Sequence, residues 1–226
     1  MRGSPERKLQ DARAVDVVSN AGADADGRAA PRFTLLIRTA KLVMAGKQHL
    51  CVIRDVSTTG ASIRTFHSLI ESDAMEIHLD TGQQFPVEQV WQKESEAGFQ
   101  FLTPIEVNDV VRGTSKYPRR DLRFEIEQEV SLLSRGQKSS SVLKNLSRQG
   151  GLIECAEPLA LAQSIKIEGD GFPDVEARVR WRKNGHYGLA FDTTFSLTNL
   201  ALLIRDLHKR QKMFSECVAE SRPKPA

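Results

Sequence analysis

Short stretches in which apolar and polar residues alternate run through most of the chain. The clearest is Val175-Glu176-Ala177-Arg178-Val179-Arg180-Trp181, where apolar side chains occupy every second position. A period of two is typical of a β-strand with one buried and one exposed face. Five other short apolar stretches in this half of the chain lie between turn-forming residues, at 124–133, 138–146, 151–154, 164–168 and 187–191. Six strands at this spacing predict a closed or nearly closed β-barrel.

From Ser196 onward the hydrophobic period changes from that of a strand to that of a helix. Four aliphatic residues fall on one helical face, namely Leu200, Leu203, Ile204 and Leu207. We therefore expect a C-terminal α-helix over residues 196–215 that packs on the preceding barrel. Ser196 or Thr198 is suited to cap its first turn.

An internal repeat divides the chain into two similar halves. The segment Asp55-Val56-Ser57-Thr58-Thr59-Gly60 returns 90 positions later as Asn145-Leu146-Ser147-Arg148-Gln149-Gly150. The same offset relates Trp91 to Trp181, Gly98 to Gly188 and Phe101 to Phe191. Upstream the offset is 91, and it relates Arg28, Arg32 and Phe33 to Arg119, Arg123 and Phe124. One extra residue in a hairpin of the first copy accounts for the difference, and the ordered set predicts two domains.

The repeat and the composition together predict the domain limits. Residues 28–111 form the first barrel and residues 119–195 the second, with a linker over 112–118. Residues 1–27 are polar and rich in Ala, Asp and Gly, which predicts a flexible N-terminal tail. Residues 216–226 are expected to form a flexible C-terminal tail after the helix. The predicted fold class is mainly β, with two tandem six-stranded barrels and a C-terminal α-helix.

Composition and charge narrow the class of function. The net charge of +3 is too small to indicate a nucleic-acid-binding surface by itself. No apolar run approaches the ~20 residues that span a bilayer, and the N-terminal segment has no stretch of signal-peptide type. We therefore expect a cytoplasmic protein without a membrane span. The sequence contains no G-x-S-x-G, Walker-type or Rossmann fingerprint, which argues against an enzyme.

The cysteine, histidine and tryptophan positions predict no metal or redox site. Cys51, Cys155 and Cys217 are odd in number and far apart, so they are expected to be buried or half-buried thiols. The five histidines have no mutual spacing for metal binding and are expected on the surface or in turns. They are His49, His67, His78, His186 and His208. Trp91 and Trp181 are expected in the barrel cores, with a stacking platform for a ligand as the alternative.

Candidate ligand-binding groups gather before and within the second barrel. Three arginines precede its first strand, namely Arg119, Arg120 and Arg123. A guanidinium is always charged and forks onto phosphate oxygens or onto the O6/N7 edge of guanine. Asn145 and Ser147 offer short polar groups for a base edge or the local backbone, and Gly150 permits a positive φ or the close approach of a flat ligand. If each group is considered alone, the alternative for the arginines is a solvated basic linker, and the alternative for the Asn-Ser-Gly segment is a plain polar turn.

In combination these residues resemble the PilZ family. The pattern begins with R-x-x-x-R, followed just over twenty residues later by D/N-x-S-x-x-G. A strand that ends in Trp and a closing strand with G-x-x-F complete it. The whole pattern occurs twice, over about residues 28–103 and 119–193. The resemblance implies barrels that bind cyclic di-GMP between the arginine segment and the Ser-Gly turn. In the second barrel it assigns the ligand to Arg119, Arg120, Arg123, Asn145, Ser147 and Gly150. In the first barrel, where alanine follows the first arginine, it assigns the ligand to Arg28, Arg32, Asp55, Ser57 and Gly60.

The resemblance predicts a cytoplasmic cyclic di-GMP receptor that is not an enzyme and uses no cofactor or metal. Ligand binding is expected to change the arrangement of the barrels and to regulate motility, exopolysaccharide or biofilm output through an unidentified protein partner. Two alternatives stay open, a ligand-free PilZ-like adaptor and a nucleic-acid-binding β-barrel protein whose affinity would fall with salt. Both arginine pairs are present, which argues against the adaptor, and the modest charge argues against nucleic acid.

Overall fold

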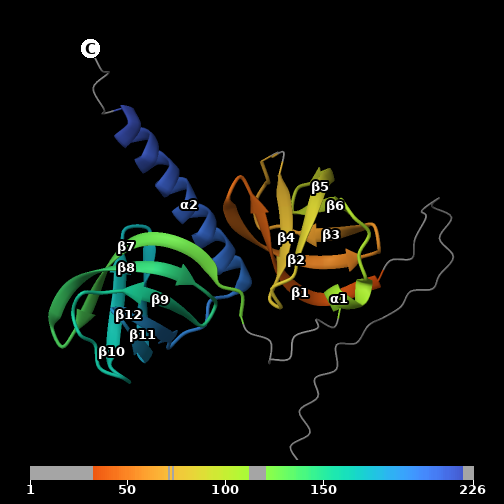
Figure 1. Cartoon of the computed structure of the whole chain (residues 1–226). Helices are drawn as coiled ribbons and strands as arrows, with labels where there is room; N and C mark the ends of the chain where they lie inside the picture. The colour runs from red at the N-terminus through yellow and green to blue at the C-terminus, as the bar shows by residue number, and fades with distance from the viewer. Residues whose placement is uncertain (1–32, 71, 73, 112–120, 221–226) are drawn as a thin grey trace, which may run out of the picture.

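The computed structural model describes residues 33–70, 72, 74–111 and 121–220, with side chains over the part of this range from 38 to 211. These residues form two closed β-barrels, a short helix after the first and a long helix after the second (Figure 1). The prediction of a mainly β protein with two six-stranded barrels and a C-terminal helix is therefore confirmed. None of the helices in the described ranges is long and apolar enough to cross a membrane.

The first barrel consists of six antiparallel strands. They are β1 (Phe33–Met44), β2 (Lys47–Val56), β3 (Gly60–Arg64), β4 (Met75–Leu79), β5 (Gln84–Lys93) and β6 (Glu96–Phe101). Their order around the barrel is β1-β2-β3-β6-β5-β4. Inward-facing residues such as Leu42, Ile53 and Phe99 form one buried cluster. The helix α1 (Val107–Val111) follows β6 and adds Val110 and Val111 to this cluster.

The second barrel repeats this arrangement. Its strands are β7 (Phe124–Ser134), β8 (Gln137–Leu146), β9 (Gly150–Glu154), β10 (Ser164–Gly169), β11 (Phe172–Lys183) and β12 (His186–Phe191). Their order is β7-β8-β9-β12-β11-β10, which matches that of the first barrel strand for strand. All six predicted strands are present, and their ends differ from the prediction by three residues or fewer.

A β-bulge explains why the two copies are offset by 91 residues upstream and by 90 downstream. From Thr34 to Arg38 the strand β1 advances by four residues, while its partner β2 advances by only two. From Glu125 to Gln128 the strand β7 advances by three residues, while its partner β8 advances by two. The bulge in β1 is thus one residue longer, and the extra residue lies in a strand of the first hairpin. The hairpin tip that joins β7 to β8, Arg135-Gly136, has positive φ at both residues, as the twist of a tight two-residue hairpin requires.

The long helix α2 (Leu197–Glu220) begins as predicted and continues past the expected end at residue 215. The Oγ of Ser196 accepts a hydrogen bond from the backbone N–H of Asn199 at 3.1 Å, which identifies Ser196 as the N-cap. The predicted apolar face of the helix is buried with the core of the second barrel. Its members are Leu200, Leu203, Ile204 and Leu207.

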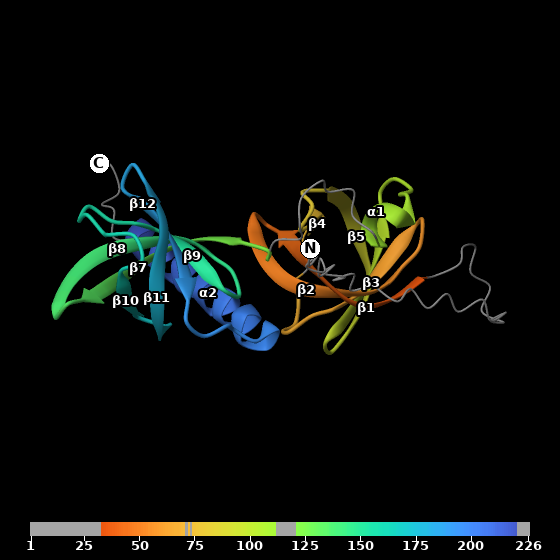
Figure 2. The same cartoon turned by 90° about the horizontal axis from the view of Figure 1, so that it is seen from below.

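The same helix also contacts the first barrel, which the sequence analysis did not predict. Figures 1 and 2 show the start of α2 between the two barrels, where it packs on β2 as well as on β7. Leu50 of β2 is buried in the cluster that forms the second barrel's core. Lys47 Nζ donates to the backbone oxygen of His208, and the backbone N–H of Glu125 donates to Gln48 Oε1, both at 3.1 Å. The barrels are therefore joined by apolar packing and by hydrogen bonds.

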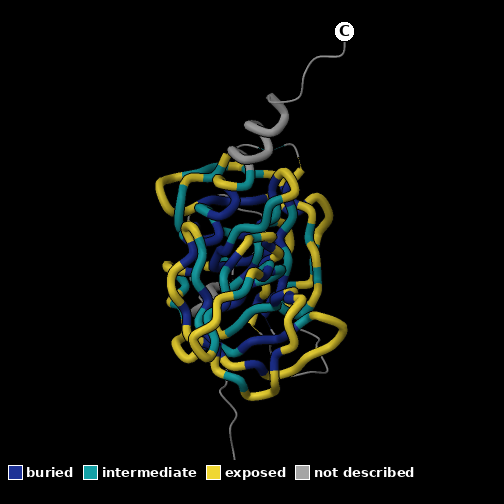
Figure 3. The backbone as a smooth tube through the Cα atoms, turned by 90° about the vertical axis from the view of Figure 1, so that its left-hand side faces the viewer, coloured by how far each residue is buried: buried dark blue, intermediate teal, exposed yellow. Residues whose placement is uncertain are grey.

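Burial in β2 departs from simple alternation because of this contact. Four consecutive residues from Leu50 to Ile53 are buried. Cys51 and Ile53 point into the first barrel, whereas Leu50 faces α2. Figure 3 shows the buried residues in dark blue inside the molecule and the exposed residues in yellow around the turns.

Candidate functional site

The Ser-Gly motif forms the turn between two strands in each barrel, as predicted. In the second barrel, β8 ends at Leu146 and β9 begins at Gly150. The backbone N–H and the Oγ of Ser147 both donate to the backbone oxygen of Gly150, at 2.8 and 3.0 Å. Ser57 donates in the same way to the oxygen of Gly60, at 2.8 and 3.2 Å. Each serine is buried and holds its turn closed, so its first role is in the backbone geometry.

The glycine of the motif is required for a reason that the sequence analysis did not identify. A Cβ on Gly150 would lie 2.1 Å from the backbone oxygen of Leu189, and one on Gly60 would lie 2.6 Å from that of Phe99. Neither glycine is among the residues with positive φ. The constraint comes from the close approach of the adjacent strand, β12 or β6. Of the two reasons expected for Gly150, a positive φ is wrong, and room for a flat ligand stays a prediction.

A cavity of about 500 Å³ lies beside this turn in the second barrel. Its size is within the range of small-molecule sites, roughly 300–1,000 Å³. Four of the predicted ligand-binding residues line it, namely Arg123, Asn145, Ser147 and Gly150. Arg119 and Arg120 lie outside the described residues. In the first barrel Arg28 and Arg32 also lie outside them, whereas Asp55, Ser57 and Gly60 occupy the equivalent turn.

Arg123 faces the cavity because of the alternation along its segment. Leu122 and Phe124 are buried in the core of the second barrel, so the intervening Arg123 and the preceding Asp121 lie on the outer side. Both line the cavity. A guanidinium at this place can bind a phosphate or a guanine edge. The Asp121 carboxylate, an acceptor, can receive a hydrogen bond from a ligand N–H.

Trp181 also lines the cavity, and the expectation that it lies in the barrel core is wrong. Its side chain is 45% exposed. Trp181 pairs with Gly188 across β11 and β12, and a Cβ on Gly188 would lie only 1.9 Å from the indole Nε1. The indole therefore lies directly over the glycine. Trp91 pairs with Gly98 in the same way in the first barrel. The sequence feature that could have indicated this contact is the spacing of seven residues between Trp and Gly in both copies.

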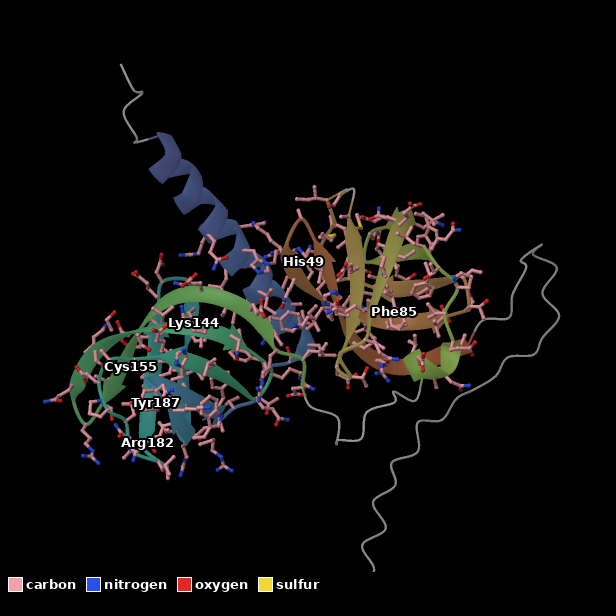
Figure 4. All side chains as sticks on the ribbon, in the orientation of Figure 1. His49, Phe85, Lys144, Cys155, Arg182 and Tyr187 are labelled. Carbon is pink, nitrogen blue, oxygen red and sulfur yellow. The ribbon has the colours of Figure 1, made fainter. Side chains whose placement is uncertain are left out.

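Three histidines cluster at the contact between the barrels, contrary to the expectation of isolated surface histidines. His49 Nδ1 lies 3.2 Å from His67 Nε2, and the rings of His49 and His208 lie 5.6 Å apart. His208 is buried, and Figure 4 shows His49 on the part of the first barrel that faces α2. Burial, together with the neighbouring Lys47 and His67, lowers the pKa of His49 and of His208 to about 4. Among the described residues no group of histidine, cysteine or acidic side chains is arranged to hold a metal ion.

The cysteines fit the expectation of buried thiols where they are described. Cys51 and Cys155 are buried and unbridged. Burial raises the pKa of Cys51 to about 12, so its thiol stays protonated and unreactive. The side chain of Cys217 lies outside the described ones.

Comparison with known proteins identifies the family of both barrels. The model of the PilZ domain matches residues 26–114 and 116–209. No curated protein sequence matches the chain. Among solved structures, the Borreliella burgdorferi PlzA protein in complex with c-di-GMP is 14% identical, with a TM-score of 0.34, and the match covers 76% of this chain and 87% of that one.

Two further solved structures are similar at the same low level. The Bacillus subtilis inhibitor of motility MotI/DgrA is 15% identical over 77% of this chain and 96% of that one, with a TM-score of 0.33. The Escherichia coli YcgR protein in complex with c-di-GMP is 13% identical over 82% and 88%, with a TM-score of 0.31. Since the family model matches both barrels and most of the sequence, the chain belongs to the PilZ domain family.

Proposed function

We propose that the protein is a receptor for cyclic di-GMP, and that the second barrel holds its principal site. The observation that carries this proposal is that Arg123, Asn145, Ser147 and Trp181 line one cavity. Membership of the PilZ family supports the choice of ligand. A flat base, a ribose and a phosphodiester need an aromatic platform, hydrogen-bond groups and a cation in one place, and this cavity offers all three.

Each residue has a distinct role in the proposed complex. Arg119, Arg120 and Arg123 grip the guanine edge and the phosphate of the ligand. Asn145 reads the guanine edge, because its amide both donates and accepts hydrogen bonds. Ser147 donates its own proton to Gly150, so its oxygen is available as an acceptor for a guanine N–H. Trp181 is 45% exposed and offers its ring face for stacking on a base.

The first barrel is proposed as a weaker second site, formed by Arg28, Arg32, Asp55, Ser57 and Gly60. The carboxylate of Asp55 accepts a hydrogen bond from Ser62 Oγ at 2.7 Å. At the position of Ser62 the second barrel has Leu152, so Asn145 has no such competitor there. The first barrel also lacks the doubled arginine of the second. Both differences favour the second barrel.

The contact between the barrels supports a change in their arrangement as the response to the ligand. The two residues after Arg123 contact the first barrel. Lys41 Nζ lies 5.6 Å above the ring of Phe124, and the backbone of Glu125 bonds to Gln48. A ligand that fixes the arginine segment would therefore act on this contact directly. We propose that the response controls motility, exopolysaccharide or biofilm output in the cytoplasm through a protein partner, without enzymatic activity.

Calorimetric titration of the full chain with cyclic di-GMP tests the proposal. We expect binding that GTP and a linear guanine dinucleotide do not compete for. A charge-assisted hydrogen bond is worth roughly 1.5–3 kcal/mol, so Arg119→Ala and Arg123→Ala should each weaken binding by about tenfold or more. Arg28→Ala and Arg32→Ala should have a smaller effect, and Arg135→Ala at an exposed hairpin tip serves as the control.

The outcomes separate the rival functions. No heat at micromolar ligand would favour the ligand-free adaptor. Binding of unrelated oligonucleotides with a steep salt dependence would favour the nucleic-acid-binding protein. Larger losses for the Arg28 and Arg32 variants would make the first barrel the principal sensor. The predicted domain limits, from the tail over 1–27 to the tail over 216–226, stay a prediction that limited proteolysis would test.

A further inference from the structure

Two consecutive residues of β11, Arg180 and Trp181, line the same cavity. In a regular strand, neighbours point to opposite faces, and Trp181 would lie in phase with the buried Val179. The pairing of β11 with β12 shifts by one residue between Val179 and Trp181. This bulge re-aims the strand, so that Arg180 and Trp181 both reach the outer side beside the cavity. The bulge thus places a guanidinium next to the exposed indole.

Arg180 differs from its neighbouring cations in having no partner among the described residues. Arg178 Nε lies 3.4 Å from Asp192 Oδ1, and Arg182 Nη1 donates to the backbone oxygen of Leu159 at 3.3 Å. No hydrogen bond or ion pair joins Arg180 to another residue in the described ranges, and its side chain is exposed. Its five donors are therefore available to a ligand in the cavity.

The position of Arg180 complements that of Arg123. The residues that line the cavity come from neighbouring segments of the barrel, in the order start of β7, β8, β9, β12 and β11. Arg123 lies at the first end of this series and Arg180 at the last. Cations at two ends of one cavity suit a ligand with two separated anionic groups, and a cyclic dinucleotide has two phosphodiesters.

The first barrel has the same bulge but lacks this arginine. The pairing of β5 with β6 shifts between Gln89 and Trp91, 90 positions before the shift in β11. The residue that corresponds to Arg180 is Val90, which is 63% exposed. The backbone of the two sites is therefore alike, whereas the second barrel alone carries a cation at this edge.

We propose that Arg180 binds the second phosphodiester of the ligand, opposite the one held by Arg123. This inference rests on the proposed function. It makes Arg180 a residue that selects a ligand with two phosphates over a mononucleotide, and it adds a third reason why the two barrels differ in affinity.

Titration of the full chain with cyclic di-GMP and with 5′-GMP tests the role of Arg180. Arg180→Val introduces the residue of the first barrel, and Arg178→Val is the matched control on the same strand. We expect Arg180→Val to weaken cyclic di-GMP binding about tenfold, as for a lost charge-assisted contact. Binding of 5′-GMP should change little, since it has one phosphate. Arg180→Lys should keep the salt dependence of the parent, whereas Arg180→Val should make it shallower.

The outcomes distinguish this inference from the function on which it rests. If the parent binds and Arg180→Val matches both the parent and Arg178→Val, the role of Arg180 is refuted and the receptor function stands. Equal losses for both valine variants would indicate a general charge effect and would also refute it. If the parent does not bind cyclic di-GMP, both proposals fail. An unchanged melting temperature for Arg180→Val, expected for an exposed side chain, shows that any loss is one of binding.

Discussion

Replacement of Leu50 by alanine would remove a side chain of the first barrel that packs into the core of the second. Leu50 is 4% exposed and belongs to the same buried cluster as Leu203 and Leu207 of α2. Leucine to alanine in a protein core costs about 2–5 kcal/mol, depending on how far the site collapses. The contact with α2 can relax by a small movement between barrels, so we expect a loss of about 2–3 kcal/mol.

The two tryptophans allow this loss to be assigned to one barrel. The chain has two, Trp91 in the first barrel and Trp181 in the second. In a Trp91→Phe background, urea unfolding followed by fluorescence reports on the second barrel alone. Leu50→Ala lies in the first barrel, yet we expect it to lower the urea midpoint of the Trp181 signal.

The matched control is Ile70→Ala, an aliphatic truncation in the same barrel at a side chain that is 81% exposed. It should change the free energy of unfolding by less than about 0.5 kcal/mol. If Leu50→Ala and Ile70→Ala give the same urea midpoint for the Trp181 fluorescence, the barrels unfold independently. The packing of Leu50 against α2 would then contribute nothing to the stability of the second barrel.

Two further predictions concern the helix and the histidines. Leu203→Asp should lower the melting temperature by the equivalent of several kcal/mol, since it buries an unpaired charge against the second barrel, and an unchanged melting temperature would mean that this face is exposed. The pKa of His49 and of His208 is lowered to about 4, below the ordinary ~6.5, so the unfolded rings take up protons first as pH falls. Stability from this pair is therefore full above about pH 6.5 and lost toward pH 4, by on the order of 2–3 kcal/mol for each ring between pH 7 and pH 4.5 in urea titrations. His208→Asn should flatten this pH dependence, and the control His186→Asn at the start of β12 should not; equal profiles for both would contradict the assignment.

The alternation of apolar residues was enough to predict every strand of the second barrel. It failed at Trp181 for a definite physical reason. Counting by twos from Val175 places Trp181 on the inner face with Ala177 and Val179, both of which are buried. The bulge after Val179 adds one residue and reverses this parity. A bulge has no reliable signature in a single sequence, so the aromatic platform of the candidate site could not be predicted from the strand pattern.

The candidate site was predictable where its residues belong to one local motif. The turn from Asn145 to Gly150 and the preceding Arg123 meet at one cavity because β7 and β8 are neighbours in a hairpin. Arg180 is distant in sequence and reaches the cavity because β9 pairs with β12 and β12 with β11. The histidine cluster could not be predicted for the same reason, since His49 and His208 meet only where α2 contacts β2.

The contact between the barrels accounts for one sequence difference between the two copies. The barrel interior constrains inward-facing positions equally in both, and Ile53 corresponds to Leu143, which is also buried. Outward positions differ, because α2 covers β2 on that side. Leu50 is apolar and buried, whereas its counterpart Ser140 is polar and exposed. An apolar residue at an outward position in one copy alone indicates a surface that only this copy buries. Apolarity alone is not enough, since Val90 is also apolar in the first copy alone and yet is 63% exposed. Burial therefore does not account for the exchange of Val90 for Arg180, and this is the difference on which the proposed role of Arg180 rests.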